Sequence, residues 1–258
     1  MSVFAGANKK RSKKTLSCTA VIAAAGSSQR MDGVDKLFAD INGKPVLAYA
    51  LEAFQSCGYV DDIIIVAREE KYNDVSDICK AFGIYKASKI IFGGPTRLLS
   101  VMNGVFAVSK KADLIAIHDG ARPCVDAGAI SRTIESASAS HAAAPAIPII
   151  STVKDVRNNI IKETVDRDGL YEIQTPQVFS AALIRAALKN ANDKSIDVTD
   201  DCYAVELLGV PVRIVEGARA NIKLTTSEDF MIAEAILCGR ASPALSFGAE
   251  PRVRREMI

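Results

Sequence analysis

The stretch TAVIAAAGSSQRM at residues 19–31 decides the fold of this 258-residue chain. Thr19–Ala25 form a continuous run of small and apolar residues, which is typical of a strand buried on both faces of a parallel sheet. The run stops at Gly26, and the small residues around it leave backbone N–H groups open to an anion. The stretch therefore predicts a buried strand that ends in an anion-binding loop.

The same pattern recurs along the chain. Further strands are predicted at Ile63–Ala67, Ile90–Phe92, Leu114–Ile117 and Ala142–Ile150. Helices are predicted from Pro45 to Phe54 and at Val75–Phe82, Arg97–Val108 and Ala129–Ala139. This alternation predicts an α/β protein with a single Rossmann-like, mostly parallel sheet flanked by helices. Ligands of such sheets bind at the carboxyl ends of the strands.

The alternation breaks near residue 150. Ser151–Ile173 is polar with alternating apolar positions and contains the turn pair Asn158-Asn159, so it predicts an inserted antiparallel β-arm at about 151–173. A lone two-stranded ribbon is only marginally stable in water, so we expect it to pack on something else, such as a second subunit. The remaining predicted elements are a helix at Ala181–Ala191, a helix start at Thr199–Asp201, a strand at Val212–Val215 and a helix at Ser227–Cys238.

Composition and charge exclude several classes of protein. The apolar fraction of 49% excludes a wholly disordered chain, and no stretch of about 18 apolar residues occurs that would predict a membrane-spanning helix. The net charge is +2, but residues 1–18 hold five bases and no acid, which leaves 27 bases against 30 acids in the rest. We interpret 1–18 and 240–258 as solvated tails around a single domain at 19–239. The alternative for the basic tail, nucleic-acid binding, predicts binding that salt weakens.

The six cysteines show no CxxC spacing, and the chain has only two histidines. A zinc site is therefore not expected, and the cysteines are typical of reduced thiols in a cytoplasmic protein. Residues 1–18 also lack the apolar segment of a secretory signal.

The first loop carries charge as well as small residues. Arg30 lies in it and Lys36 follows, so the loop and its cations suit a polyphosphate. The pattern is neither GxGxxG nor a Walker A motif. On spacing alone, an ordinary tight turn with two solvated bases remains an equal alternative.

Several motifs follow the loop in a fixed order. They are AAGSSQRM (24–31), KLF (36–38), INGKPVL (41–47), GGPTRLLSV (93–101), HDGARP (118–123), TVDRDGL (164–170), QTPQ (174–177) and NIKLT (221–225). Together they resemble the 2-C-methyl-D-erythritol 4-phosphate cytidylyltransferase family of the non-mevalonate isoprenoid pathway, over about residues 19–238. The sequence departs from the family pattern at Ser28, Gln29, Pro95 and Gly120, and Pro95 removes a backbone N–H donor.

The resemblance implies transfer of CMP from CTP to 2-C-methyl-D-erythritol 4-phosphate, by in-line attack at the α-phosphate with release of pyrophosphate. Arg30 and Lys36 would be the catalytic cations that stabilise charge on the transferring and leaving phosphates. The implied nucleotide-binding residues are Ala24, Ala25, Gly26, Gly94, Ser100 and Gly120. The implied substrate-binding residues are Asp119, Thr152, Arg167, Thr175 and Lys223.

The resemblance also implies partners. Mg²⁺ or another divalent cation is expected mainly on the CTP phosphates, with Asp119 as the candidate protein ligand. Because the family uses such an arm to form a homodimer, we expect a shared active site in which Arg167 reaches the other subunit. Two alternatives remain open: a ribitol-5-phosphate cytidylyltransferase, and a CTP-binding protein that kept the fold and lost catalysis.

Overall fold

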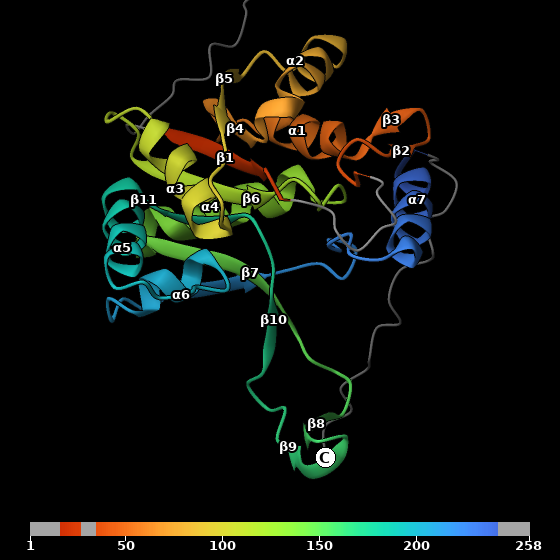
Figure 1. Ribbon diagram of the computed structural model, residues 1–258, viewed down its shortest axis with the longest axis vertical. Coiled ribbons are helices and arrows are strands. Elements are labelled where there is room, and N and C mark those ends of the chain that lie inside the picture. Colours follow the sequence, from red (N-terminus) through yellow and green to blue (C-terminus); the bar gives the residue numbers. More distant parts are fainter. Residues whose placement is uncertain (1–15, 27–34, 242–258) are drawn as a thin grey trace, which may run out of the picture.

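Strand β1 (Cys18–Ala24) lies inside the main sheet and pairs in parallel with β6 (Leu114–Asp119) on one side and β4 (Asp62–Ala67) on the other. The computed structural model describes residues 16–26 and 35–241, and Figure 1 shows their arrangement. Strand β5 (Ala87–Phe92) follows β4 in parallel. These four strands confirm the predicted parallel sheet, although β5 begins three residues before the predicted strand.

The other half of the sheet is mixed. In the described residues the whole sheet has eight strands: seven run in the order β10-β7-β11-β6-β1-β4-β5, and β12 pairs with β7. The remaining bounds are β7 Ala142–Pro148, β10 Tyr171–Ile173, β11 Gln177–Ser180 and β12 Arg213–Glu216. Strand β11 is antiparallel to both β6 and β7, and β10 is antiparallel to the end of β7. The sequence patterns predicted neither β10 nor β11 as sheet strands.

Helices cover both faces of this sheet. Their bounds are α1 Val46–Ser56, α2 Tyr72–Ala81, α3 Arg97–Ala107, α4 Ala127–Ser140, α5 Ala181–Asp193, α6 Asp201–Glu206 and α7 Ser227–Ala241, with a short 3-10 helix at Glu69–Lys71. Each predicted helix is present, and α7 continues three residues beyond its predicted end. Among the described residues, none of these helices is both long and apolar enough to cross a membrane.

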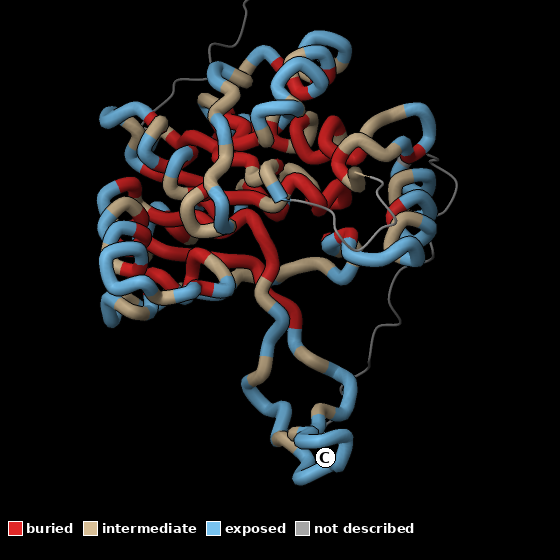
Figure 2. Tube along the Cα trace, viewed as in Figure 1, coloured by how far each residue is buried: buried red, intermediate tan, exposed pale blue. Residues whose placement is uncertain are grey.

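Alternate residues of β1 enter two separate apolar clusters. Ala20 and Ile22 pack with side chains of α1, α2, α4 and α7, whereas Val21 packs with side chains of α3, α5 and α6. All three of these β1 residues are fully buried, and the strands of the main sheet are largely red in Figure 2. Because both faces of β1 are covered, its sequence reads as a continuous apolar run rather than an alternating one.

Two hairpins lie outside the main sheet. Strands β8 (Val153–Arg157) and β9 (Ile160–Val165) form the predicted arm, with the predicted turn at Asn158 and Asn159, whose φ angles are +50° and +62°. The arm projects away from the sheet and is largely exposed (Figures 1 and 2). The structure differs from the expected limits of the arm at Tyr171–Ile173, which extend the main sheet along β7. The second hairpin joins β2 (Asp40–Ile41) and β3 (Lys44–Pro45).

Candidate active site

A cleft of about 500 Å³ opens where β1, β4, β5 and β6 end. It is lined by Ala23, Ala25, Gly26, Lys36, Leu37, Arg68, Gly94, Pro95, Thr96, Arg97, Ser100, Asp119, Ala121 and Lys223. An adjoining hollow of about 160 Å³ shares Arg97, Asp119 and Lys223 with the cleft. The cleft therefore lies at the edge of the sheet where ligands of open α/β sheets bind.

Most residues of the predicted site meet in this cleft. Ala25, Gly26, Lys36, Gly94, Ser100, Asp119 and Lys223 line it, and Thr175 lines the adjoining hollow. Ala24 and Gly120 are buried and do not line either space. Arg30 lies outside the described residues, as do residues 1–15 and 242–258 of the predicted tails.

Two glycines bring the loop after β5 against its neighbours: Gly93 packs on the loop after β1, and Gly94 packs on the start of α3. A Cβ atom on Gly93 would lie 2.4 Å from the Ala25 Cβ, and one on Gly94 would lie 2.6 Å from the Leu99 Cβ. The Ser100 hydroxyl accepts a hydrogen bond from Gly94 N at 3.0 Å and lies 2.9 Å from the Thr96 carbonyl oxygen. Thr96 then caps α3 by accepting a bond from Leu99 N. The structure thus makes Ser100 a buried residue that fixes the shape of this loop.

Asp119, the last residue of β6, is the centre of charge in the cleft. Lys223 Nζ lies 2.8 Å from its Oδ2, Arg122 Nε lies 3.8 Å from the same oxygen, and Arg97 Nη2 lies 3.9 Å from its Oδ1. Burial alone raises the pKa of Asp119, but the charges of Lys223, Arg97 and Arg122 outweigh it and lower the pKa to about 2. Asp119 is therefore an anion that gathers three cations at the end of one strand.

Arg97 also forms a salt bridge with a second carboxylate, that of Asp201. Its two terminal nitrogens lie 3.1 and 2.8 Å from the two oxygens of Asp201, which is fully buried at the start of α6. Burial lowers the pKa of Arg97, but the Asp201 carboxylate raises it by more, so the guanidinium stays charged. The sequence motif contains Arg97, but no sequence pattern indicated a partner at Asp201, 104 residues away.

The floor of the site is a network of neutral groups. Thr175 Oγ1 lies 2.8 Å from Nδ1 of the fully buried His118 and accepts a hydrogen bond from Asp119 N at 3.2 Å. Burial lowers the pKa of His118 to about 4, which keeps the ring neutral near pH 7. The Thr175 hydroxyl, predicted to bind substrate, is thus already bonded to residues of the sheet.

Lys36 reaches across the cleft to the segment that carries Lys223. Its Nζ donates to the Leu224 carbonyl oxygen at 2.9 Å, and Leu224 N in turn donates to the Ala121 carbonyl oxygen at 2.9 Å. Two predicted cations from distant parts of the chain are therefore placed beside one another.

Thr152 and Arg167 lie elsewhere, on the arm. Both are exposed, and Arg167 donates a hydrogen bond to the carbonyl oxygen of Ile150 at the base of the arm. Neither residue lines the cleft of its own chain.

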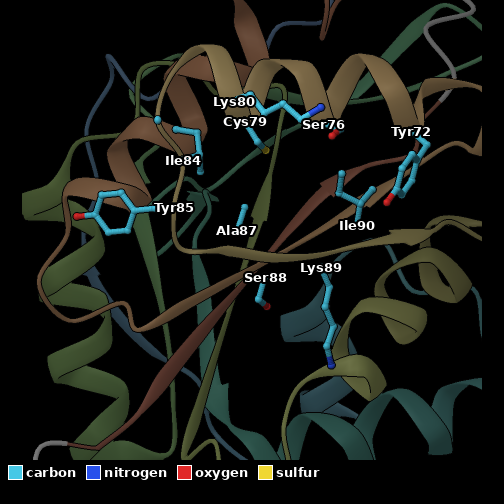
Figure 3. Close-up of a pocket in the computed structure, with 11 residues that line it drawn as sticks. Tyr72, Ser76, Cys79, Lys80, Ile84, Tyr85, Ala87, Ser88, Lys89 and Ile90 are labelled. Atoms are coloured by element: carbon cyan, nitrogen blue, oxygen red, sulfur yellow. The ribbon is translucent and has the colours of Figure 1, made fainter.

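A second hollow of about 440 Å³ lies over α2 and β5, as Figure 3 shows. Its lining includes Tyr72, Cys79, Lys80 and Lys89 but no Asp, Glu or His. Burial raises the pKa of the Cys79 thiol to about 11, so it is not an activated nucleophile near neutral pH. The carboxyl-end cleft is therefore the better candidate for an active site.

A mostly parallel sheet with a cationic cleft at its strand ends, entered by a loop of small residues, defines an α/β enzyme that handles phosphate groups. Comparison with known proteins narrows this class. The family model "IspD: 2-C-methyl-D-erythritol 4-phosphate cytidylyltransferase" matches residues 18–239. The chain belongs to this family, and it is a nucleotidyltransferase. The resemblance drawn from the sequence motifs is thereby confirmed.

Individual relatives agree with the family model. The 2-C-methyl-D-erythritol 4-phosphate cytidylyltransferase of Halalkalibacterium halodurans is 41% identical over 218 residues, which cover 84% of this chain and 95% of the relative. That of Dehalococcoides mccartyi strain 195 is 41% identical over 219 residues, with the same two coverages. The crystal structure of 4-diphosphocytidyl-2C-methyl-D-erythritol synthase from Anaerococcus prevotii is 30% identical, has a TM-score of 0.77 and covers 87% of this chain and 97% of that one.

Proposed function

We propose that the carboxyl-end cleft transfers CMP from CTP to 2-C-methyl-D-erythritol 4-phosphate and releases pyrophosphate. In this reaction an oxygen of the alcohol phosphate attacks the α-phosphorus of CTP in line, and the bond to the pyrophosphate leaving group breaks. The observation that carries the proposal is the convergence of Lys36, Arg97 and Lys223 on one cleft beside Asp119. Two anions that repel each other need such a set of fixed cations more than they need a nucleophilic side chain.

CTP occupies the half of the cleft between the loops that follow β1 and β5. The backbone of Ala25 and Gly26 is open there, and Gly94 and Ser100 shape the opposite wall for the cytosine and ribose. Lys36 lies at the phosphate end, where it stabilises charge on the transferring and leaving phosphates. Arg30 is assigned the same task by its place in the motif alone.

The alcohol phosphate occupies the half nearer Asp119 and Lys223. In the free protein Lys223 Nζ is 2.8 Å from the Asp119 carboxylate, yet its side chain is 42% exposed. Lys223 can therefore turn from Asp119 to an incoming phosphate, and Asp119 can then accept hydrogen bonds from substrate hydroxyl groups. Arg97 stays with Asp201 and keeps the negative charge of Asp119 balanced during this exchange.

A divalent cation, Mg²⁺ by expectation, joins the CTP phosphates. The described part of the chain holds no group of three or more His, Cys, Asp or Glu side chains placed for a metal ion. Phosphate oxygens and water would supply most of its ligands, and Asp119, anionic and at the cleft, would be the protein group placed to contact a metal-bound water. The cation supplies neutralisation of the α- and β-phosphate charges.

The arm completes the site of a second copy of the chain. Arg167 and Thr152 are exposed and line no part of their own cleft, although the family resemblance assigns Arg167 to the alcohol phosphate and Thr152 to the same substrate. Ile150, Val156, Ile160 and Ile161 are also exposed on or beside the arm, so it offers apolar surface to a partner. A homodimer in which each arm reaches the other subunit accounts for both facts. Six free cysteines agree with a reducing, cytoplasmic location.

Mixing two inactive variants tests this shared site. Lys36→Ala and Arg167→Ala chains are each expected to have low turnover with CTP and the alcohol phosphate. When the two are unfolded together and refolded, half of the dimers are mixed, and each mixed dimer holds one site with an intact Lys36 and an intact Arg167. Pyrophosphate release should therefore recover to about a quarter of the wild-type rate. Mixtures that stay as inactive as their parents would show that Arg167 acts within its own chain, and an Arg167→Ala chain with wild-type turnover would show that Arg167 has no role.

The choice of alcohol is tested separately. The wild-type chain should release pyrophosphate faster with 2-C-methyl-D-erythritol 4-phosphate than with ribitol 5-phosphate, at equal CTP and Mg²⁺. A preference for ribitol 5-phosphate would overturn the proposed substrate, and CTP binding without turnover on either alcohol would overturn the proposed reaction.

A further inference from the structure

Arg68 is a cation of the cleft that no sequence motif assigns. It comes directly after Ala67, the last residue of β4, and its side chain is 24% exposed at the cleft wall. Its Nη2 pairs with the Asp35 carboxylate, and its Nε lies 2.9 Å from the Glu70 carboxylate. Arg68 therefore links the end of a core strand to residue 35, immediately before Lys36.

Asp35 organises the turn that carries Lys36. Its Oδ1 accepts a hydrogen bond from Leu37 N at 3.2 Å, while its carbonyl oxygen accepts bonds from Phe38 N at 3.0 Å and Ala39 N at 3.1 Å. On the other side of Lys36, the buried Leu37 accepts a bond from Leu47 N at 2.9 Å through its carbonyl oxygen. The turn is thus anchored to α1 after Lys36 and to β4, through Arg68, before it.

We propose that Arg68 and Asp35 form a positioning pair that holds Lys36 at the phosphate end of the cleft. The inference rests on the role proposed above for Lys36. A flexible lysine acts on a transition state only if its backbone is fixed, and a misplacement of about 1 Å is enough to cost up to 100-fold in rate. The Leu37 anchor fixes one end of the turn, and the ion pair fixes the other.

A purely electrostatic role for Arg68 makes a different prediction. If Arg68 only added positive charge near the triphosphate, removal of the Asp35 charge would expose that cation and strengthen CTP binding. If the pair positions Lys36, removal of either partner weakens catalysis. The sign of the effect at Asp35 therefore separates the two roles.

The first test compares Asp35→Asn and Arg68→Gln with Glu70→Gln in steady-state pyrophosphate release. Asn keeps the oxygen that accepts from Leu37 N but loses the charge, so Asp35→Asn removes the ion pair and spares the turn. Both variants of the pair should lower kcat about tenfold, with KM for CTP changed less than about threefold. Glu70→Gln, which removes the other carboxylate on Arg68, should leave kcat within about twofold. A higher kcat/KM in Asp35→Asn, or an equal loss in Glu70→Gln, would overturn the positioning role.

The second test repeats Arg68→Gln in a Lys36→Ala background. If Arg68 acts through Lys36, its loss adds nothing once the lysine is absent, whereas a direct contact with phosphate would cause a further loss of similar size. Arg68→Lys should recover most of kcat because it restores a cation for Asp35, and this rescue guards against a variant that simply unfolds. If Lys36→Ala alone leaves kcat unchanged, the proposed role of Lys36 fails and this inference with it. If Lys36→Ala lowers kcat but the two losses add, only this inference fails.

Discussion

Asp119 in the cleft and Asp155 on the arm are both paired with a cation, but their surroundings are opposite. The Asp119 side chain is 13% exposed and faces three cations, with Lys223 at 2.8 Å. The Asp155 side chain is 35% exposed and faces one cation, Arg157, at 3.5 Å. The protein thus fixes its charges where the sheet buries them and leaves them loosely paired on the arm. This difference is what we expect if one chain fixes the charges at its own strand ends, whereas the arm makes its contacts with a second chain.

The same substitution in the two regions gives the largest expected contrast. Asp119→Asn leaves Lys223, Arg97 and Arg122 without their common counter-charge, so we expect a loss of about 2–3 kcal/mol in the free energy of unfolding. Turnover should fall at least about 100-fold. Asp155→Asn removes an exposed pair and should change the free energy of unfolding by less than about 0.5 kcal/mol. Chemical denaturation and pyrophosphate release measure both, and similar values for the two variants would remove the distinction.

The pH dependence of the free energy of unfolding reports on His118, at the floor of the cleft. The pKa of His118 is about 4 in the folded protein and about 6.5 in an unfolded chain, so unfolding takes up a proton between these values. The contribution of His118 to the free energy of unfolding is fully present above pH 6.5. Below that pH it falls by about 1.4 kcal/mol per pH unit, which amounts to about 2 kcal/mol between pH 7 and 5. The contribution of Asp119 is lost only at lower pH, as its folded pKa is about 2.

Denaturant unfolding at pH 7 and pH 5 checks this expectation. His118→Asn keeps a polar atom for Thr175 and cannot titrate, so its free energy of unfolding should vary by about 2 kcal/mol less than that of the wild type across the same interval. An identical pH dependence in both proteins would mean that His118 is not held neutral by burial.

The smallest expected effect concerns the arm alone. Asn159 has a φ of +62°, a conformation that Asn tolerates better than Ala, and the difference is about 1 kcal/mol. Asn159→Ala should speed amide hydrogen exchange in β8 and β9 about fivefold and leave β1 and β6 unchanged, because the arm opens on its own. Asn159→Gly, which accepts the same φ, is the matched control. Faster exchange in β1 would show that the arm and the sheet unfold together.

The sequence predicted those parts of the fold that depend on a short, continuous pattern of residues. Thr19–Ala25 predicted a strand buried on both faces, and Asn158-Asn159 predicted the turn of the arm. Strand β11 was missed because its four residues follow Pro176 and its antiparallel pairing depends on β6 and β7, far away along the chain. No short window of sequence encodes that pairing.

The same distinction between local patterns and long-range pairing holds for the candidate active site. Asp119 could be placed at a strand end from the apolar run before it, and Lys36 and Lys223 from their motifs. Arg68 also follows a predicted strand directly, and that position was a signal that could have found it. Its partner Asp35 and the Arg97 partner Asp201 lie 33 and 104 residues away, so the pairing became visible only in the fold.

The chain that leads from the arm back to the cleft is fixed by hydrogen bonds at Gln174. Gln174 N donates to the Pro145 carbonyl oxygen at 2.8 Å, its side-chain nitrogen donates to the Ala218 carbonyl oxygen at 2.8 Å, and Thr175 follows with its bond to His118. Because these bonds fix the backbone at Gln174, movement of the arm is confined to the residues that precede it. In the proposed homodimer, the arm can therefore shift against the other subunit while Thr175 and His118, at the floor of the cleft, keep their positions.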